Sequence, residues 1–506
     1  MYNSCYTCRR RHVECQMSEP PCKKCQKAGL ECLQKRPLRW VKGATFRGTA
    51  KASVNTPYKP DRAISSQFGS TVTIIKNLER WPATTFDIAL SHIPLGLGEP
   101  VTRSLDEDSQ YYLNYYSKCV CKLFVMFDSQ RNPLRQLIPA AIAHPVLLSS
   151  VVALAARHRA NITQTFDQIL ATQQQATALE PRYGASLYKY QAIRGLRQAL
   201  DEGTTSIDIL IVSAFLLILL DLFESGNDNW NFHVEGVKKL IAEIRVSTSS
   251  RELGTTIEGM RNFAMRQVYL IDTLGTTFTR PGLLVDSPTH QPSTTLQMSA
   301  DKAYLGCPEY FLDVLRSFSA ARDCLASLEQ LDSIGADSLL HTIKVSLEST
   351  QSFDCCSWAK DVELPCSSNP LPTRTLQDLE DLGQAYKLGT LIYGWRVCDV
   401  LTGDSTPLED IEEELISMLA SLRSNEALFK CILWPLFVAG LETRDESQKQ
   451  LVGDCLRRFW FETKCINVIN AEKILQRFWA EAEQGSSSRS NWIFSMGQID
   501  GDWLLI

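Results

Sequence analysis

The stretch CYTCRRRHVECQMSEPPCKKCQKAGLEC, residues 5–32, decides how the N-terminal end of this chain folds. Its three leading cysteines recur 17 residues later in the same pattern. A C-x2-C pair lets two thiolates bind one metal ion from a single turn, and zinc takes four tetrahedral ligands with sulfur at ~2.3 Å. The repeat therefore predicts a zinc site formed by Cys5, Cys8, Cys15, Cys22, Cys25 and Cys32.

Two zinc ions need eight ligand positions, whereas this segment offers six thiolates. Two thiolates must therefore bridge, which gives one binuclear cluster with approximate two-fold symmetry. A segment of this length has almost no core, so we expect metal binding to supply its folding energy. The alternative is a disulfide framework. The N-terminus MYNSCYTCRRR has no apolar core typical of a secretion signal, which favours zinc.

The motif C-x2-C-x6-C-x6-C-x2-C-x6-C resembles the fungal zinc binuclear cluster family of transcription factors. Arg9 and Arg11 after the second cysteine, Pro20 before the fourth, and Gly29-Leu30 before the sixth are also similar to that family. The resemblance implies that Cys5 and Cys22 are the bridging thiolates. It also implies a first helix, Arg9 to Glu14, that enters the major groove of DNA, where the family often reads CGG-like triplets.

Basic residues surround the cluster, and DNA binding needs such residues to neutralise phosphates. Three positions depart from the family pattern: Glu14 replaces a basic residue, His12 stands where Lys or Arg is common, and Gln16 replaces a frequent Asp. A carboxylate at position 14 would repel phosphate and weaken binding. The predicted DNA contacts are Arg9, Arg10, Arg11, His12, Lys23, Lys24, Lys27, Arg39 and Lys42.

The charge of the chain is unevenly distributed. Residues 1–60 hold thirteen Lys and Arg against three Asp and Glu, an excess of +10, so the remainder carries -15 within a total of -5. A basic head on an acidic body indicates a polyanionic partner for the head. The basic run could instead be a solvated face, and residues 35–39 (KRPLR) could serve as a nuclear import signal.

Residues 36–103 read as a basic, flexible linker, because they lack periodicity and contain repeated Gly and Pro. No heptads extend over three or more repeats, so a coiled-coil dimer is not predicted. A homodimer formed through the body, or contact with transcription co-regulators, remains open. Residues 38–43 (LRWVKG), with Arg47-Gly48, resemble the stretch that follows the cluster in one large fungal subgroup.

From residue 104 to 485 the apolar residues recur at helical spacing and β-type alternation is scarce, which predicts an all-α domain. Residues 486–506 remain as a C-terminal tail. Leu187, Tyr190, Ile193, Leu196 and Leu200 mark the apolar side of one amphipathic helix. The other helices are expected at 146–160, at 207–223, from His233 to Ile244, and within 405–482.

Three body segments, residues 132–160, 190–241 and 434–446, resemble the fungal-specific transcription factor domain of the same subgroup. The resemblance implies a helical regulatory region that acts in effector response or partner contact. No residue of the body identifies an effector site. The acidic residues of 408–415 (LEDIEEEL) could form an activation surface, although a solvated helix face is the simpler interpretation.

No catalytic constellation is apparent, so the sequence predicts that the protein is not an enzyme. Phosphate loops, nucleophile elbows and zinc-protease helices are all missing. His144, His158 and His233 are interpreted as structural residues. Residues 351–372, with Cys355, Cys356 and Cys366, are interpreted as an inserted loop with ordinary thiols. The longest apolar run, Ile209 to Leu220, is shorter than the ~20 residues that span a bilayer.

These features predict a nuclear, sequence-specific regulator of RNA polymerase II genes, which binds double-stranded DNA and two Zn²⁺ ions. An alternative is a zinc-containing nuclear interaction protein with weakened DNA binding that acts through its helical domain. A third hypothesis is an α-helical enzyme with an appended zinc module.

Overall fold

The computed structural model describes residues 7–8, 15, 22–28, 32, 105–171, 180–224, 230–246, 255–279, 305–326, 333–362, 373–483, 492–496 and 503–506. The chain divides into two compact units, Met1–Tyr58 and Lys59–Ile506. The second unit, Lys59–Ile506, is called the body.

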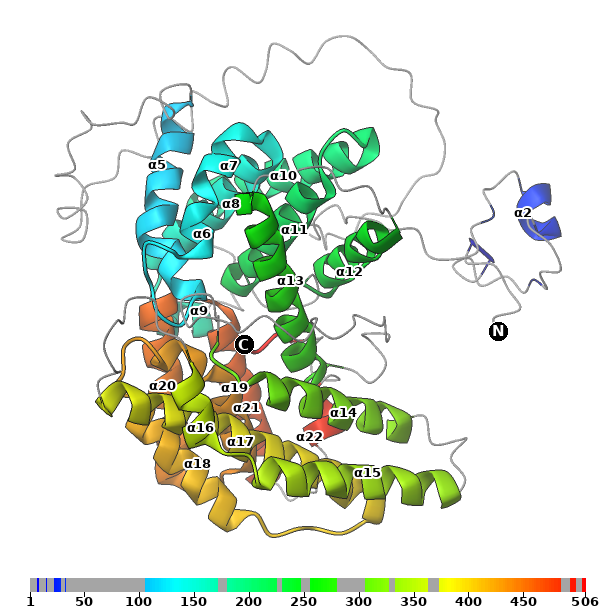
Figure 1. Cartoon of the computed structure of the whole chain (residues 1–506), viewed down its shortest axis with the longest axis vertical. Coiled ribbons are helices and arrows are strands. Elements are labelled where there is room, and N and C mark those ends of the chain that lie inside the picture. Colours follow the sequence, from blue (N-terminus) through cyan, green and yellow to red (C-terminus); the bar gives the residue numbers. More distant parts are fainter. Residues whose placement is uncertain are drawn as a thin grey trace. The chain divides into compact units, whose positions relative to one another are not determined.

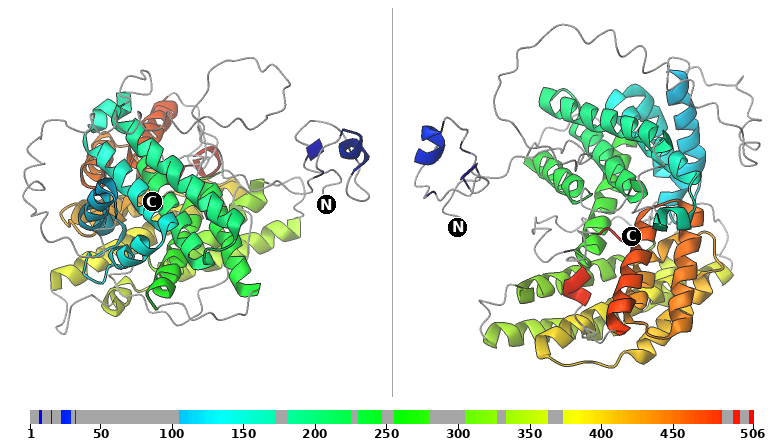
Figure 2. Two further views of the ribbon diagram at one scale, coloured as in Figure 1. Left: turned by 90° about the horizontal axis from the view of Figure 1, so that it is seen from above. Right: turned by 180° about the vertical axis from the view of Figure 1, so that it is seen from behind.

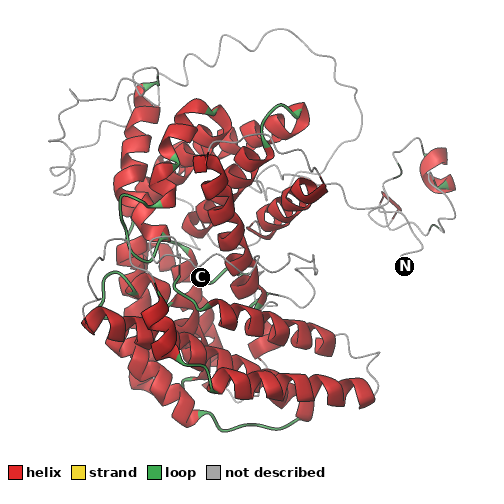
Figure 3. Cartoon of the chain, viewed as in Figure 1, coloured by secondary structure: helices red, strands yellow, loops and turns green. Residues whose placement is uncertain are grey.

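Every element of two residues or more in the described part of the chain is a helix (Figure 3), which confirms the all-α prediction for the body. The first unit contributes α2 (Lys23–Lys27). The body contains α5 (Glu107–Tyr115), η3 (Tyr116–Val120), η4 (Cys121–Phe124), α6 (Pro133–Gln136), α7 (Ile138–Ala143), α8 (Pro145–Ile162), α9 (Phe166–Ala171), α10 (Glu180–Glu202), α11 (Ile207–Glu224), α12 (Trp230–Val246), α13 (Thr255–Thr276), α14 (Glu309–Ala326), α15 (Ser333–Gln351), α16 (Cys355–Asp361), α17 (Thr373–Thr402), α18 (Glu409–Leu422), η8 (Phe429–Cys431), α19 (Leu433–Glu442), α20 (Glu446–Thr463), α21 (Asn467–Glu483) and α22 (Trp492–Ser495).

The N-terminal half of the body is built around α8 and α11. Helix α8 packs against α10 and α11, and α11 also contacts α12 and α13 (Figures 1 and 2). Pro145 at the first position of α8 fits its start, because the first helical N–H groups have no partner within the helix. Residues 208–223 of α11 are all buried, so this helix forms the centre of the half.

The C-terminal half of the body is organised by α17, the 30-residue helix that contacts α14, α15, α16, α18 and α19. Glycines let its neighbours approach closely. A Cβ atom at Gly394 would lie 2.5 Å from Phe318, and one at Gly389 would lie 2.8 Å from Trp434. Side chains at these positions would therefore push the helices apart.

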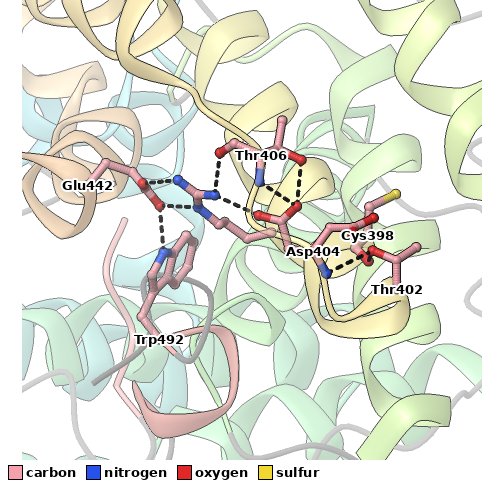
Figure 4. Close-up of polar contacts among 8 residues, drawn as sticks. Cys398, Thr402, Asp404, Thr406, Glu442 and Trp492 are labelled. Carbon is pink, nitrogen blue, oxygen red and sulfur yellow. Dashed lines mark hydrogen bonds and ion pairs between the residues drawn. The ribbon is translucent and has the colours of Figure 1, made fainter. Parts of the chain in front are cut away.

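A buried polar network joins α17 to α19 and α22 (Figure 4). Arg396 donates to both carboxylate oxygens of Glu442, at 2.9 and 2.6 Å, and to Asp399 at 2.6 Å. The Trp492 indole donates to Glu442 at 2.8 Å, and Asp399 accepts from the Thr406 backbone N–H at 3.0 Å. The Arg396 side chain is 0% exposed, so its charge is compensated entirely inside the protein.

The segment predicted as a C-terminal tail contains buried residues. Trp492 is buried among Phe278 and Tyr393, and residues 503–506 are buried as well. Asn467 at the start of α21 donates its amide to the backbone oxygens of Leu504, at 3.4 Å, and Ile506, at 3.2 Å. The end of the chain therefore forms part of the body's core.

Two predictions made for the body are wrong. Residues 351–362 are not one continuous loop: α15 ends at Gln351, and α16 forms at Cys355–Asp361 after a short turn. The Asp354 carboxylate caps α16 by accepting from the N–H groups of Cys356 and Ser357. Residues 363–372, including Cys366, lie outside the described residues.

The second wrong prediction concerns α10. Tyr190 is 60% exposed, although it was predicted on the apolar side of this helix. The buried stripe consists mainly of small residues, Ala185, Ala192 and Ala199, together with Leu196. Small side chains let α10 approach α8 closely, and the larger Tyr190 lies outside this contact.

None of the described helices is both long enough and apolar enough to cross a membrane.

Candidate metal centre and nucleic-acid interface

Helix α2 brings two cysteines of the second half-motif onto one side of the backbone. Cys22 is the N-cap of α2 in extended conformation, and its Sγ accepts from the Cys25 N–H at 3.4 Å. Its own N–H donates to the Cys32 Sγ at 3.2 Å. Backbone N–H groups directed at sulfur stabilise thiolates, the form that binds metal.

Five of the six predicted zinc ligands lie in the described part of the chain and come together in two groups. The Sγ atoms of Cys8, Cys15 and Cys22 lie within 4.8 Å of one another, and so do those of Cys22, Cys25 and Cys32. Cys22 belongs to both groups. A thiolate shared by two groups is what a binuclear cluster requires, since six sulfurs must serve eight ligand positions.

The sulfur–sulfur distances within and between the two groups are those of neighbouring thiolates. The Cys8 Sγ lies 3.7 Å from the Sγ of Cys22, in its own group, and 3.7 Å from the Sγ of Cys25, in the other group. Tetrahedral zinc with bonds of ~2.3 Å separates its sulfurs by about 3.8 Å, whereas a disulfide measures ~2.05 Å. The Cys8–Cys22 distance therefore fits two ligands of one metal ion, and neither pair is at disulfide distance.

Cys5 and the predicted recognition helix from Arg9 to Glu14 lie outside the described residues. Thr7 and Cys8, which precede that helix in the sequence, are described and are helical. Each group of three sulfurs lacks one ligand for tetrahedral zinc. Because Cys5 is the remaining cysteine of the motif, the donor set fits two zinc ions if Cys5 bridges both groups.

The exposed side of helix α2 is positively charged. Lys23, Lys24 and Lys27 are exposed, while Cys25 on the same helix is buried. Six thiolates and two divalent ions together carry a formal charge of about -2, so surrounding basic residues are needed if the unit is to approach DNA. The other predicted DNA contacts, Arg9, Arg10, Arg11, His12, Arg39 and Lys42, lie outside the described residues.

The backbone N–H bonds to the Cys22 and Cys32 sulfurs are the part of this centre that sequence reasoning missed. They depend on the extended conformation of Cys22 before α2, which residue spacing does not encode. A typical N-cap residue before α2 would have signalled these bonds in the sequence. Cysteine is not among the usual N-cap residues, so position 22 gave no such signal.

Two histidines of the body, His158 and His233, are buried in packed surroundings. His158 is buried between Tyr115, whose hydroxyl lies 2.7 Å from Nδ1, and Phe223. His233 lies 3.7 Å from the buried Asp221 carboxylate. Burial lowers the pKa of each imidazole to about 3, so both rings are neutral. Among the described residues, the two cysteine groups are the sets of side chains placed to hold a metal ion.

Comparison with known protein families agrees with the two-unit division. The model of the fungal Zn(2)-Cys(6) binuclear cluster domain matches residues 3–41, and that of the fungal specific transcription factor domain matches residues 111–506. The chain is also similar to the acriflavine sensitivity control protein acr-2 of Neurospora crassa. The two are 23% identical over 593 aligned positions, which cover 99% of this chain and 97% of that protein.

Proposed function

Because the chain belongs to the fungal transcription factor family that joins a Zn(2)-Cys(6) cluster to a fungal specific transcription factor domain, we propose that it is a sequence-specific regulator of RNA polymerase II genes in the nucleus. Transcription regulation and the binding of two zinc ions follow from the family itself. The mode of DNA reading, the polymerase and the location in the cell belong to the proposal.

The observation that carries this proposal is the pair of sulfur groups sharing Cys22, with exposed lysines on the attached helix α2. The cluster fixes two short helical segments relative to each other without a hydrophobic core. Such a rigid unit can place a helix in the major groove, where base edges are read, while lysines bind phosphates.

In the proposed complex, Cys5 and Cys22 bridge the two zinc ions, and the segment from Arg9 to Glu14 lies in the groove. Arg9, Arg10, Arg11 and His12 supply base or phosphate contacts from this first half of the motif. Lys23, Lys24 and Lys27 supply phosphate contacts from the second half, and Arg39 and Lys42 extend them along the backbone.

The electrostatic part of the proposal is tested by salt titration of DNA binding with the zinc-loaded full chain. Each phosphate contact contributes ~0.9 to the slope of log K against log salt. Lys24→Gln and Lys27→Gln should each reduce this slope by about one. Lys449→Gln is the control, because Lys449 lies in the body and pairs with Glu483. Unchanged slopes in both α2 variants would contradict the proposed contacts.

Zinc removal is the second arm of this test. A chelator should abolish DNA binding, because the metal holds the DNA-contacting segments in place. Binding that survives complete chelation would show that the cluster is not the DNA-binding element.

A second candidate function rests on Glu14, whose carboxylate occupies a position that carries a basic residue in the family. On this hypothesis the head binds DNA weakly, and the helical domain acts on other regulators. Glu14→Lys separates the two hypotheses by measurement of affinity for duplex DNA. If Glu14 faces phosphate, the substitution should increase affinity and steepen the salt slope. Equal binding by both proteins would exclude that placement of Glu14.

The name of the Neurospora crassa relative indicates control of sensitivity to acriflavine. Since the likeness extends over nearly the whole of both chains, we propose that this protein also regulates genes that determine tolerance to toxic compounds. Deletion of its gene in the native host should change growth on acriflavine. Identical growth of the deletion and parent strains over a concentration series would contradict this proposal.

A further inference from the structure

A group of basic side chains lies where the two halves of the body meet. Its members come from η4, the end of α8, η8 and the residue that follows α20, and they are called the basic patch: Lys122, Arg159, Lys430 and Lys464. Lys122 is exposed and the other three are partly exposed. Residues 61–506 carry a net charge of -15, so this group has the opposite sign to its surroundings.

Two hydrogen bonds between the halves fix the backbone and side chains of the basic patch. The Lys430 ammonium donates to the backbone oxygen of Lys122 at 2.6 Å. The Asn161 amide, at the end of α8, donates to the backbone oxygen of Lys464 at 2.9 Å. Arg159 lies on the same last turn of α8 as Asn161. Segments far apart in the sequence therefore bring their cations to one place.

The buried His158 ring lies within the field of three of these cations. Burial is the main cause of its low pKa, and Lys464, Lys122 and Arg159 lower that pKa further. Electrostatic effects of this kind extend over only ~10 Å under ordinary ionic conditions. The positive charges therefore act together as one surface feature.

The lysines of the basic patch lack acidic partners within the protein. In the part of the chain that the structure describes, none of them makes an ion pair. The two carboxylates near Lys430 are already paired: Asp128 binds Arg135 at 2.9 Å, and Glu462 binds Arg458 at 2.7 Å. Like charges held close together repel one another, so an anionic partner that neutralised them would be bound favourably.

An exposed aromatic side chain borders the basic patch. Phe461 on α20 is 72% exposed, more than any other large apolar side chain among the described residues. The Lys464 ammonium lies 5.3 Å from the centre of the Phe461 ring and 5.2 Å from that of Trp460. These cation–π contacts hold the charge beside the ring. A partner can therefore meet positive charge and an apolar surface at adjacent points.

These features favour an acidic polypeptide over a nucleic acid. A long nucleic acid would bring phosphates close to Asp128 and Glu462 and along a strongly negative body, which would repel it. A short acidic segment meets the basic patch alone, and its apolar side chains can pack on Phe461. Segments that combine acidic and apolar residues are typical of disordered activation regions.

We propose that the basic patch binds an acidic segment of a partner protein, with carboxylates on the patch cations and an apolar side chain on Phe461. The patch lies in the body, so this interaction is separate from DNA binding by the head. The bound segment contacts both halves of the body and should stabilise their association by mass action.

The test uses the zinc-loaded full chain and a fluorescent synthetic peptide with the sequence of residues 408–415 (LEDIEEEL). In the folded body Leu408 and Leu415 are buried, so α18 does not itself offer this segment. The counterpart peptide has Gln and Asn in place of Glu and Asp. By fluorescence anisotropy, the acidic peptide should bind at least tenfold more tightly, or about 1.4 kcal/mol. Equal binding, or no binding of the acidic peptide at about 1 mM, would overturn the proposal.

Two double variants with the same change of charge locate the peptide. Lys122→Gln with Lys464→Gln removes two charges of the basic patch, so the affinity for the acidic peptide should fall at least tenfold. Lys24→Gln with Lys27→Gln removes two charges from the basic head and should leave that affinity unchanged. The reverse result would place the peptide on the head and would overturn the proposal.

Duplex DNA distinguishes the proposed partner from a nucleic acid. The Lys122→Gln, Lys464→Gln protein should bind duplex DNA as tightly as the parent protein, because the DNA contacts are assigned to the head. A lower DNA affinity in this variant would make the basic patch a nucleic-acid surface and would contradict the proposal. The DNA contacts of the head are tested with other variants, so this proposal can fail while the proposed function stands.

Discussion

Cys22 illustrates how much depends on one side chain in the head. It belongs to both sulfur groups, caps α2, and donates its N–H to Cys32. Cys15 belongs to one group. The two cysteines are the same residue type in the same motif, but Cys22 belongs to two sulfur groups and Cys15 to one.

This difference gives a quantitative prediction. Cys22→Ala should remove a ligand from both zinc ions and reduce bound zinc from two ions to about none, whereas Cys15→Ala should remove a ligand from one. Cys307→Ala, in the body, is the control and should keep the full zinc content. Zinc per chain is measured by atomic emission after dialysis. Equal, partial zinc loss in Cys22→Ala and Cys15→Ala would contradict the shared position of Cys22.

His158 predicts how stability depends on pH. Burial lowers its pKa to about 3, so the folded ring stays neutral while the unfolded ring gains a proton below pH ~6.5. Stability from this group is therefore present above that pH and is lost as the pH falls. Between pH 7 and 5 the loss should be about 2 kcal/mol. Buried His233 acts in the same direction, and Asp221, whose pKa is raised to about 6, acts in the opposite direction.

The measurement is urea unfolding of the full chain at pH 7 and pH 5. His158→Gln should reduce the stability difference between the two pH values, whatever its effect on absolute stability. His341→Gln, at an exposed position on α15, should leave that difference unchanged. A pH dependence that is equal in His158→Gln and the parent protein would show that the ring is not held neutral.

At the scale of elements, buried and exposed ion pairs contribute differently. Arg396→Met leaves Glu442 and Asp399 buried without a cation, which should cost about 3–5 kcal/mol of unfolding free energy. Arg197→Met removes an exposed pair with Asp201 on α10 and should cost less than about 0.5 kcal/mol. Both are measured by urea unfolding. Similar values for the two variants would contradict the role of Arg396 in joining α17 to α19.

The helices that were predicted best are those whose own sequence decides their burial. The runs at 146–160 and 207–223 correspond to α8 and α11 because most side chains in them are apolar. Helix α16 was missed because a short helix is decided by its cap, Asp354, and not by apolar periodicity. Tyr190 was misplaced because α10 buries a stripe of alanines, which periodicity of large residues does not reveal.

At the scale of the whole molecule, the metal centre and the buried Arg396 network differ in how far sequence could predict them. The cysteine spacing identified all the candidate ligands, since they lie within 28 consecutive residues. The network combines Arg396 of α17, Glu442 of α19 and Trp492 of α22, which meet only after these helices have packed. Local sequence patterns therefore predict the cysteine site, whereas a feature assembled from distant helices arises only from tertiary packing.

The central claim is that the zinc-organised head reads DNA sequence. The most direct test is a selection from random duplex DNA with the zinc-loaded full chain, followed by affinity measurement of the selected site at physiological salt. The account predicts a recurring short motif, bound about 10³-fold or more over random DNA, that is lost on chelation. Salt-sensitive binding with no recurring motif would contradict it, because the head would then hold DNA only by charge.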